Sequence, residues 1–206
     1  MPARYHRFAG SSLERLAALS DGVFAVAMTL LVLDLKPPSL VKHSLGYGLL
    51  HHVAPHLLPY AMSFLTLGIF WVGQQTQFGS FTRSTRALTW IHIAFLMAVT
   101  LLPFATALLA QDTNHRLSVA VYWLNLFLLG VVLLASLRYA ERAGLFSDET
   151  TPEVRGALER RIVVYQALYA PAALTCLINS YLAIGLIVVL QLNAVIAPRI
   201  WILDRA

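Results

Sequence analysis

Six long apolar segments, separated by short polar stretches, make up most of the chain. They cover residues 16–35, 54–78, 87–110, 117–139, 160–180 and 182–203. Each is close to the roughly 20 residues that an α-helix needs to cross the hydrocarbon core of a bilayer. The pattern predicts an all-α integral membrane protein with six transmembrane helices, folded as a single domain over residues 1–206.

The polar separators set the predicted boundaries. Lys36-Pro37-Pro38 stops the first helix, because consecutive prolines cannot continue it. The stretch 138–161 predicts a solvated hairpin, with a helix start at Thr150-Thr151-Pro152-Glu153. The last apolar run, from Ile162 to Leu203, is too long for one span, and the polar pair Asn179-Ser180 marks the predicted break.

Composition agrees with a membrane protein. Hydrophobic residues make up 58% of the chain and charged residues 12%, whereas soluble proteins are about 45–50% apolar and about 25% charged. The single cysteine, Cys176, excludes an intrachain disulfide. The sequence also lacks the His-Glu-x-x-His and Gly-x-Ser-x-Gly motifs. We therefore expect no enzymatic activity, no cofactor and no resident metal.

The net charge of +5 predicts orientation rather than nucleic-acid binding. With six spans both termini share a side, and that side collects twelve of the fifteen Lys and Arg residues: Arg4, Arg7, Arg15, Arg83, Arg86, Arg138, Arg142, Arg155, Arg160, Arg161, Arg199 and Arg205. The other side holds Lys36, Lys42 and Arg116. Because cytoplasmic loops are rich in Lys and Arg, we expect both termini in the cytoplasm and a multi-pass protein of the cell (inner) membrane.

The first helix carries two stripes and one charge. At 100° per residue, one apolar stripe contains Leu19, Val26, Leu30 and Leu33. A second stripe holds the small residues that let helices approach closely in lipid, Ala18, Gly22, Ala25 and Thr29. Asp21 belongs to neither stripe, and it points away from the branched apolar one.

Asp21 needs a polar partner if it lies at membrane depth. Inserting an ionisable side chain there costs at least about 2.5–3.5 kcal/mol, so such groups face the protein interior. The candidate partners are Arg15, Trp71, Gln74, Trp90 and His92. Alternatively, Asp21 belongs to the cytoplasmic start of the helix, with Ser20 as its N-cap. Both interpretations give Asp21 a structural role.

The segment Arg15-x-x-x-Leu19-Ser20-Asp21 resembles the Arg-x-x-x-Phe-Ser-Asp signature of the transmembrane protein 175 family, the lysosomal potassium channels and their prokaryotic relatives. Residues 22–33 are similar to the family's first helix and residues 101–109 to part of its third span. The chain departs at Leu19, where Phe is usual, and at Gln74-Gln75, where a histidine-containing pair is expected. If that histidine joins a hydrogen-bonded network with the signature Arg and Asp, another residue must take its place in this chain.

The resemblance implies a homotetramer that favours potassium among the monovalent cations and lines a central pore with four copies of the first helix. The implied channel has no Thr-Val-Gly-Tyr-Gly filter and holds no metal beyond the permeating K⁺. The implied pore-lining and constriction residues are Val26, Thr29, Leu30 and Leu33. The implied structural network contains Arg15, Ser20, Asp21, Trp71 and His92. We further interpret Asp34, one residue after Leu33, as a candidate external ring that concentrates cations.

Two other functions stay open at this level. A proton- or ion-coupled small transporter would need several carboxylates along one path, and the spans offer only Asp21 and Asp34. A non-conducting membrane scaffold is opposed only by the family resemblance. The potassium-favouring channel is therefore the principal hypothesis.

Overall fold

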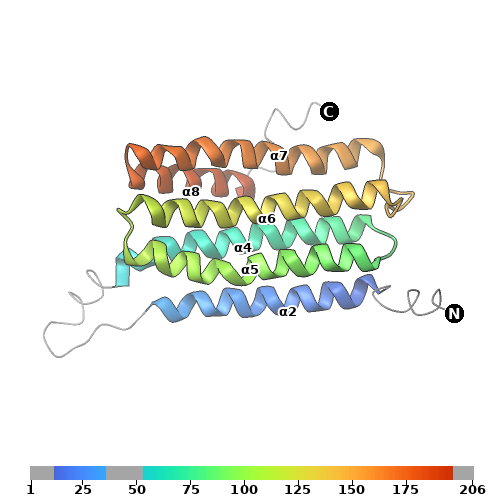
Figure 1. Cartoon of the computed structure of the whole chain (residues 1–206), viewed down its shortest axis with the longest axis horizontal. Helices are drawn as coiled ribbons and strands as arrows, with labels where there is room; N and C mark the ends of the chain where they lie inside the picture. The colour runs from blue at the N-terminus through green and yellow to red at the C-terminus, as the bar shows by residue number, and fades with distance from the viewer. Residues whose placement is uncertain (1–11, 36–52, 197–206) are drawn as a thin grey trace, which may run out of the picture.

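The computed structural model describes residues 12–35 and 53–196, which form six helices lying side by side (Figure 1). The helices are α2 (Leu13–Leu31), α4 (Ala54–Ser80), α5 (Arg86–Gln111), α6 (Arg116–Arg142), α7 (Pro152–Leu174) and α8 (Ser180–Ile196). Consecutive helices run in opposite directions along one common axis. The predicted all-α, six-helix fold class is confirmed.

The six helices are not equal as membrane spans. Within the described ranges, four are long and apolar enough to cross a bilayer: α2 with its extension to Asp34, α4, α5 and α6. Helix α8 is a shorter apolar helix of 17 residues, and α7 begins in a polar stretch. The predicted sixth span reached residue 203, and its last part, 197–203, lies outside the described residues.

Short polar residues precede several of the helices. The Ser12 hydroxyl accepts a hydrogen bond from the Arg15 amide at 3.2 Å, and Thr85 caps α5 in the same way. Helix α7 starts at Pro152 after Thr151, where a helix start was expected. The Thr151 side chain hydrogen-bonds to Glu153 and lowers the pKa of that exposed carboxyl.

Two predicted boundaries need correction. Residues 152–161 belong to α7, so the polar hairpin is much shorter than 138–161. The first helix is α-helical only to Leu31 and continues as a 3₁₀ turn over Val32–Asp34. The predicted break at Asn179-Ser180 is confirmed, because α8 begins at Ser180 and the Asn179 side chain accepts from the Tyr181 amide at 2.8 Å.

One end of the bundle is tied together by its loops. Phe81, after α4, forms an antiparallel bridge with Phe146, after α6. Two backbone hydrogen bonds of 2.9 Å flank it, from Thr82 N to Leu145 O and from Ser147 N to Ser80 O. The start of α2 lies at this same end (Figure 1). The two loops therefore fix how the α4–α5 and α6–α7 hairpins sit relative to each other.

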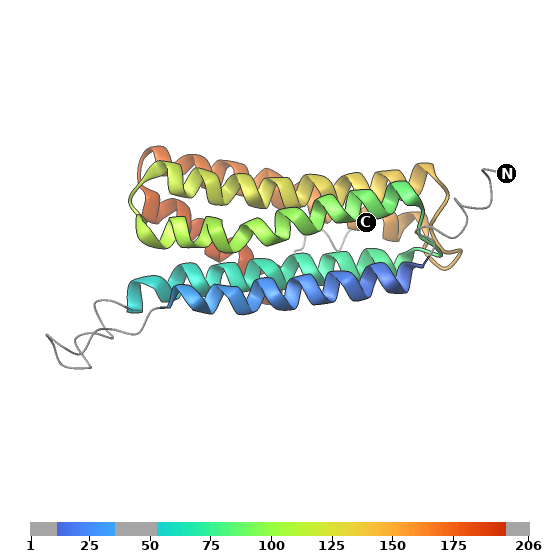
Figure 2. The ribbon, with the colours of Figure 1, turned by 60° about the horizontal axis from the view of Figure 1, so that its bottom comes forward.

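Helix α2 lies at an edge of the bundle. It packs against α4 and α5, and Figure 2 shows it alongside α4 over its length. Helix α7 lies at the opposite edge in Figure 1. The apolar core between them is built around α5 and α6, with Phe95, Tyr122 and Leu129 fully enclosed. An edge position leaves much of the α2 circumference exposed among the described residues.

Candidate pore-lining helix and its anchor

One face of α2 is buried in the subunit. It carries Leu16, Ser20, Phe24, Ala27 and Leu31, at spacings of three and four residues. Phe24 lies against Phe95 of α5, with ring centroids 6.1 Å apart. This face holds α2 on the bundle, so any contact with ions or other subunits must use the remaining surface.

The opposite face of α2 is apolar and exposed. Val26 is 58% exposed, Leu30 44% and Leu33 68%. In a chain of membrane-spanning helices, such a face contacts lipid, another chain or a pore. The side chains implied as constrictions therefore share one face that is free within the subunit.

Thr29 lies on the exposed surface beside these residues. Its hydroxyl donates to the Val26 carbonyl oxygen at 2.8 Å. A threonine hydroxyl has one proton and two lone pairs, so its donor is used within the helix and its oxygen can still accept from outside. This arrangement suits contact with a cation.

The small residues of α2 are also exposed. Ala18, Gly22 and Ala25 make no close packing face within the subunit, and a Cβ added to Gly22 would meet no atom within 4 Å. Close approach of backbones along this stripe would therefore require another chain.

Asp21 anchors α2 to α4. Its Oδ1 accepts a hydrogen bond from Trp71 Nε1 at 2.8 Å and another from Gln75 Nε2 at 2.6 Å. Trp71 and Gln75 are four residues apart and so lie on one face of α4. Trp71, one of the five candidate partners, makes this contact, and Gln75 supplies the second donor within the residue pair where the family pattern led us to expect a histidine.

His92 belongs to a different contact from the one expected. Its ring nitrogens lie 3.1 Å from Gln74 Nε2 and 2.9 Å from Ser136 Oγ. His92 is fully buried and links α4, α5 and α6. It does not contact Asp21, because α5 places it on the interior side of α4 whereas Asp21 meets the outer side.

The other expected members of the network are also separate. The Ser20 hydroxyl donates to the Leu16 carbonyl oxygen within α2 at 2.9 Å. Arg15 is exposed, and within residues 12–35 and 53–196 it forms no ion pair with Asp21. Trp90 is 61% exposed, and among the described residues it forms no hydrogen bond with Asp21. The five-residue network thus reduces to one pair, Asp21 and Trp71, completed by Gln75.

Gln75 is the contact that the sequence interpretation missed. The signal was its spacing, because a residue four positions after Trp71 shares its helix face. The rotation of α4 about its axis decides whether Gln74 or Gln75 faces Asp21. Two adjacent glutamines do not indicate that rotation.

Asp34 lies in the 3₁₀ turn and is half-buried, with Leu33 beside it more exposed. A 3₁₀ turn has about three residues per turn rather than 3.6. The directions of Leu33 and Asp34 therefore differ from those of a continued α-helix. Among the described residues no group of His, Cys, Asp or Glu could hold a metal ion.

Comparison with known proteins places this geometry in a family. Residues 15–103 match the family described as endosomal/lysosomal potassium channel TMEM175. A potassium channel of Chamaesiphon minutus is 30% identical over 184 residues, which is 86% of this chain and 91% of the relative. One from Streptomyces collinus is 36% identical over 141 residues, 65% of this chain and 67% of the relative.

A solved structure gives the same result. The lysosomal potassium-selective channel TMEM175 homolog from Chamaesiphon minutus superposes with a TM-score of 0.77 at 28% identity, covering 89% of this chain and 96% of that one. Fold, signature segment and relatives agree. The chain belongs to the TMEM175 family of potassium channels.

Proposed function

We propose that this protein is a potassium-favouring cation channel that conducts as a homotetramer, with four copies of α2 around a central pore. The observation that carries the proposal is the exposed face of α2 with Val26, Thr29, Leu30 and Leu33. The relatives named as potassium channels support it. The permeating ion is K⁺, with the bilayer and other monovalent cations as the remaining partners.

The mechanism is gating by an apolar constriction. A narrow ring of Leu30 or Leu33 side chains excludes water, and therefore ions, until the ring widens. Val26 adds a further apolar layer. The Thr29 oxygen between these layers replaces part of the hydration shell of a passing cation, because its lone pairs are not used within the helix.

The anchor on α4 governs how α2 moves. Asp21 accepts from two donors of the same helix, Trp71 and Gln75, so α2 is held to α4 near its middle. Widening at Leu33 then needs a tilt of α2 about this anchor. Asp34, next to Leu33, adds negative charge where cations approach.

Orientation is part of the proposal. Arg83 after α4, Arg142 at the end of α6 and Arg155 near the start of α7 lie at the same end of the bundle as the start of α2, which supports a cytoplasmic position for that end. Both termini then lie in the cytoplasm, and the protein resides in the cell (inner) membrane.

A liposome flux assay tests the proposal. The purified protein is compared for K⁺, Na⁺ and N-methyl-D-glucamine under a fixed membrane potential, alongside Leu33→Ser. We expect K⁺ flux to exceed Na⁺ flux, no flux of the organic cation, and a higher resting K⁺ flux in the variant, because a polar ring no longer excludes water.

The matched control is Leu124→Ser, an exposed leucine in the middle of α6, which should leave K⁺ flux unchanged. Unchanged leak in Leu33→Ser would remove Leu33 as the closed constriction. If the unmodified protein and Leu33→Ser both form intact tetramers but show no ion flux, the channel proposal is contradicted and a scaffold or a coupled transporter is favoured.

A further inference from the structure

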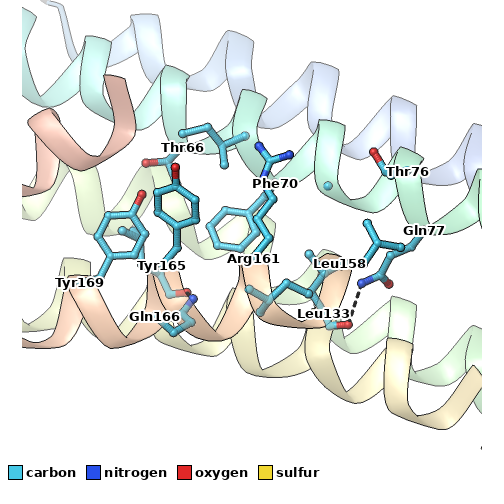
Figure 3. Close-up of a pocket in the computed structure, with 14 residues that line it drawn as sticks. Thr66, Phe70, Thr76, Gln77, Leu133, Leu158, Arg161, Tyr165, Gln166 and Tyr169 are labelled. Atoms are coloured by element: carbon cyan, nitrogen blue, oxygen red, sulfur yellow. Dashed lines mark hydrogen bonds between the residues drawn. The ribbon is translucent and has the colours of Figure 1, made fainter. Parts of the chain in front are cut away.

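A crevice lies between α4 and α7, on the side of the bundle away from α2 (Figure 3). Both helices pack against α6 and α8 but make little direct contact with each other. The enclosed space of the crevice is about 80 Å³, well below the roughly 300–1,000 Å³ of sites that enclose a drug-sized ligand. The crevice can therefore receive only one segment of a molecule that lies along its open mouth, such as a stretch of hydrocarbon chain.

The walls of the crevice are mostly apolar. They include Ile69 and Phe70 of α4, Leu126 and Leu133 of α6, and Leu158 and Ile162 of α7. Gly73 has no side chain to fill the α4 wall, and a Cβ there would only touch Leu133 at 3.4 Å. A flexible hydrocarbon chain gains free energy by lying against such a surface.

One positive charge stands at the crevice. Arg161 is exposed, and in Figure 3 its guanidinium extends from α7 toward α4. It is the only charged side chain of the lining. Among residues 12–35 and 53–196 the one ion pair joins Arg138 to Glu159, so Arg161 has no carboxylate partner there. An arginine in this state is suited to a phosphate, which its guanidinium binds through two hydrogen bonds.

The surroundings favour a lipid over a soluble anion. The crevice opens on the side of a bundle of membrane-spanning helices, and its apolar wall lies directly beside the charge. A membrane phospholipid with an acidic head group carries both matching parts at once. We propose that this crevice binds one such lipid, with an acyl chain on the apolar wall and the head-group phosphate paired with Arg161.

Native mass spectrometry of the full chain released from detergent tests the proposal. The probes are dioleoylphosphatidylglycerol and dioleoylglycerol, which share acyl chains, and only the first carries a head-group phosphate. We expect about tenfold higher retention of the acidic lipid, the ratio that corresponds to one hydrogen-bonded charge pair. Arg161→Gln should remove this preference, and Gly73→Phe should reduce retention of both lipids by filling the crevice.

Arg160→Gln is the matched control, since it removes the same charge from the neighbouring position, which does not line the crevice. It should retain the preference. Equal retention of both lipids by the unmodified chain, or equal losses in Arg160→Gln and Arg161→Gln, would overturn the proposal. The proposal would also be overturned if lipid were retained only after removal of residues 197–206, because the crevice would then be occupied by the chain's own C-terminal segment. The readout is binding, so the result is independent of whether the protein conducts.

Discussion

The Thr29 side chain combines a hydrogen bond within its own helix with an exposed position. Its hydroxyl proton is used by the Val26 carbonyl oxygen, which leaves only acceptor capacity on the exposed side. Thr100 of α5 has the same local geometry, with a 2.8 Å bond to the Met97 carbonyl oxygen and an exposed position. The two threonines differ only in the helix that carries them.

Thr29→Val should lower K⁺ flux in the liposome assay, because the isosteric methyl removes the oxygen that replaces cation hydration. Thr100→Val should leave flux at the level of the unmodified protein. Because both variants remove the same i to i−3 hydrogen bond, a similar loss in both would show that helix stability, and not the pore oxygen, is responsible.

At the scale of elements, α2 is divided into surfaces with different partners. Its buried face packs on α5, Asp21 holds it to α4, and the rest is exposed. The anchor uses a charged acceptor with two donors, and hydrogen bonds to charged groups contribute about 1.5–3 kcal/mol each. The contribution here is at the lower end, because the contact is partly exposed.

Asp21→Ala should lower the thermal stability of the detergent-solubilised protein and reduce the tetramer fraction in size-exclusion chromatography, since Trp71 and Gln75 lose their acceptor. Asp21→Asn should recover part of the loss, because its amide oxygen still accepts. Asp112→Ala, an exposed acidic residue after α5, is the control.

Because Asp21 contacts α4, its replacement should not change the ion preference of the channel. Tetramers of Asp21→Ala that remain stable should keep the K⁺ over Na⁺ preference. A stable tetramer that has lost this preference would place Asp21 in the ion path and contradict its role as an anchor.

For the whole molecule, the edge position of α2 is the decisive feature. A helix in the middle of the bundle would be covered on all sides, whereas within residues 12–35 and 53–196 the small-residue stripe of α2 is exposed. Small residues allow close approach of helices in lipid. This stripe is the natural contact with a neighbouring copy in the proposed tetramer.

Gly22→Leu should weaken assembly, measured as the tetramer fraction in native mass spectrometry, while leaving the helix content of the subunit unchanged by circular dichroism. Gly185→Leu on α8, where an added Cβ also meets no atom within 4 Å, should assemble normally. Normal tetramers of Gly22→Leu would exclude this stripe as a subunit contact.

Most of the fold could be predicted from local pattern. The helix order, the break at Asn179-Ser180 and the start of α7 near Thr151 follow from apolar length, polar interruptions and capping residues, all of which are local. The fifth apolar segment, predicted from residue 160, begins earlier as α7 at Pro152, because the first turns of α7 contain charged residues that carry no apolar periodicity. Helix propensity and a proline at the first position were enough to form its first turns.

Apolar length, helical periodicity and one signature segment are enough to predict a helical membrane protein, a first helix with an apolar stripe and a charge that needs a partner, and the family that the chain resembles. Packing of the bundle brings Gln75 and not Gln74 to Asp21, turns His92 inward to Ser136, and places Arg161 at an apolar crevice. One cause accounts for all three placements. Periodicity fixes which residues share a helix face, but the rotation of each helix and its neighbours is set by packing of the whole bundle.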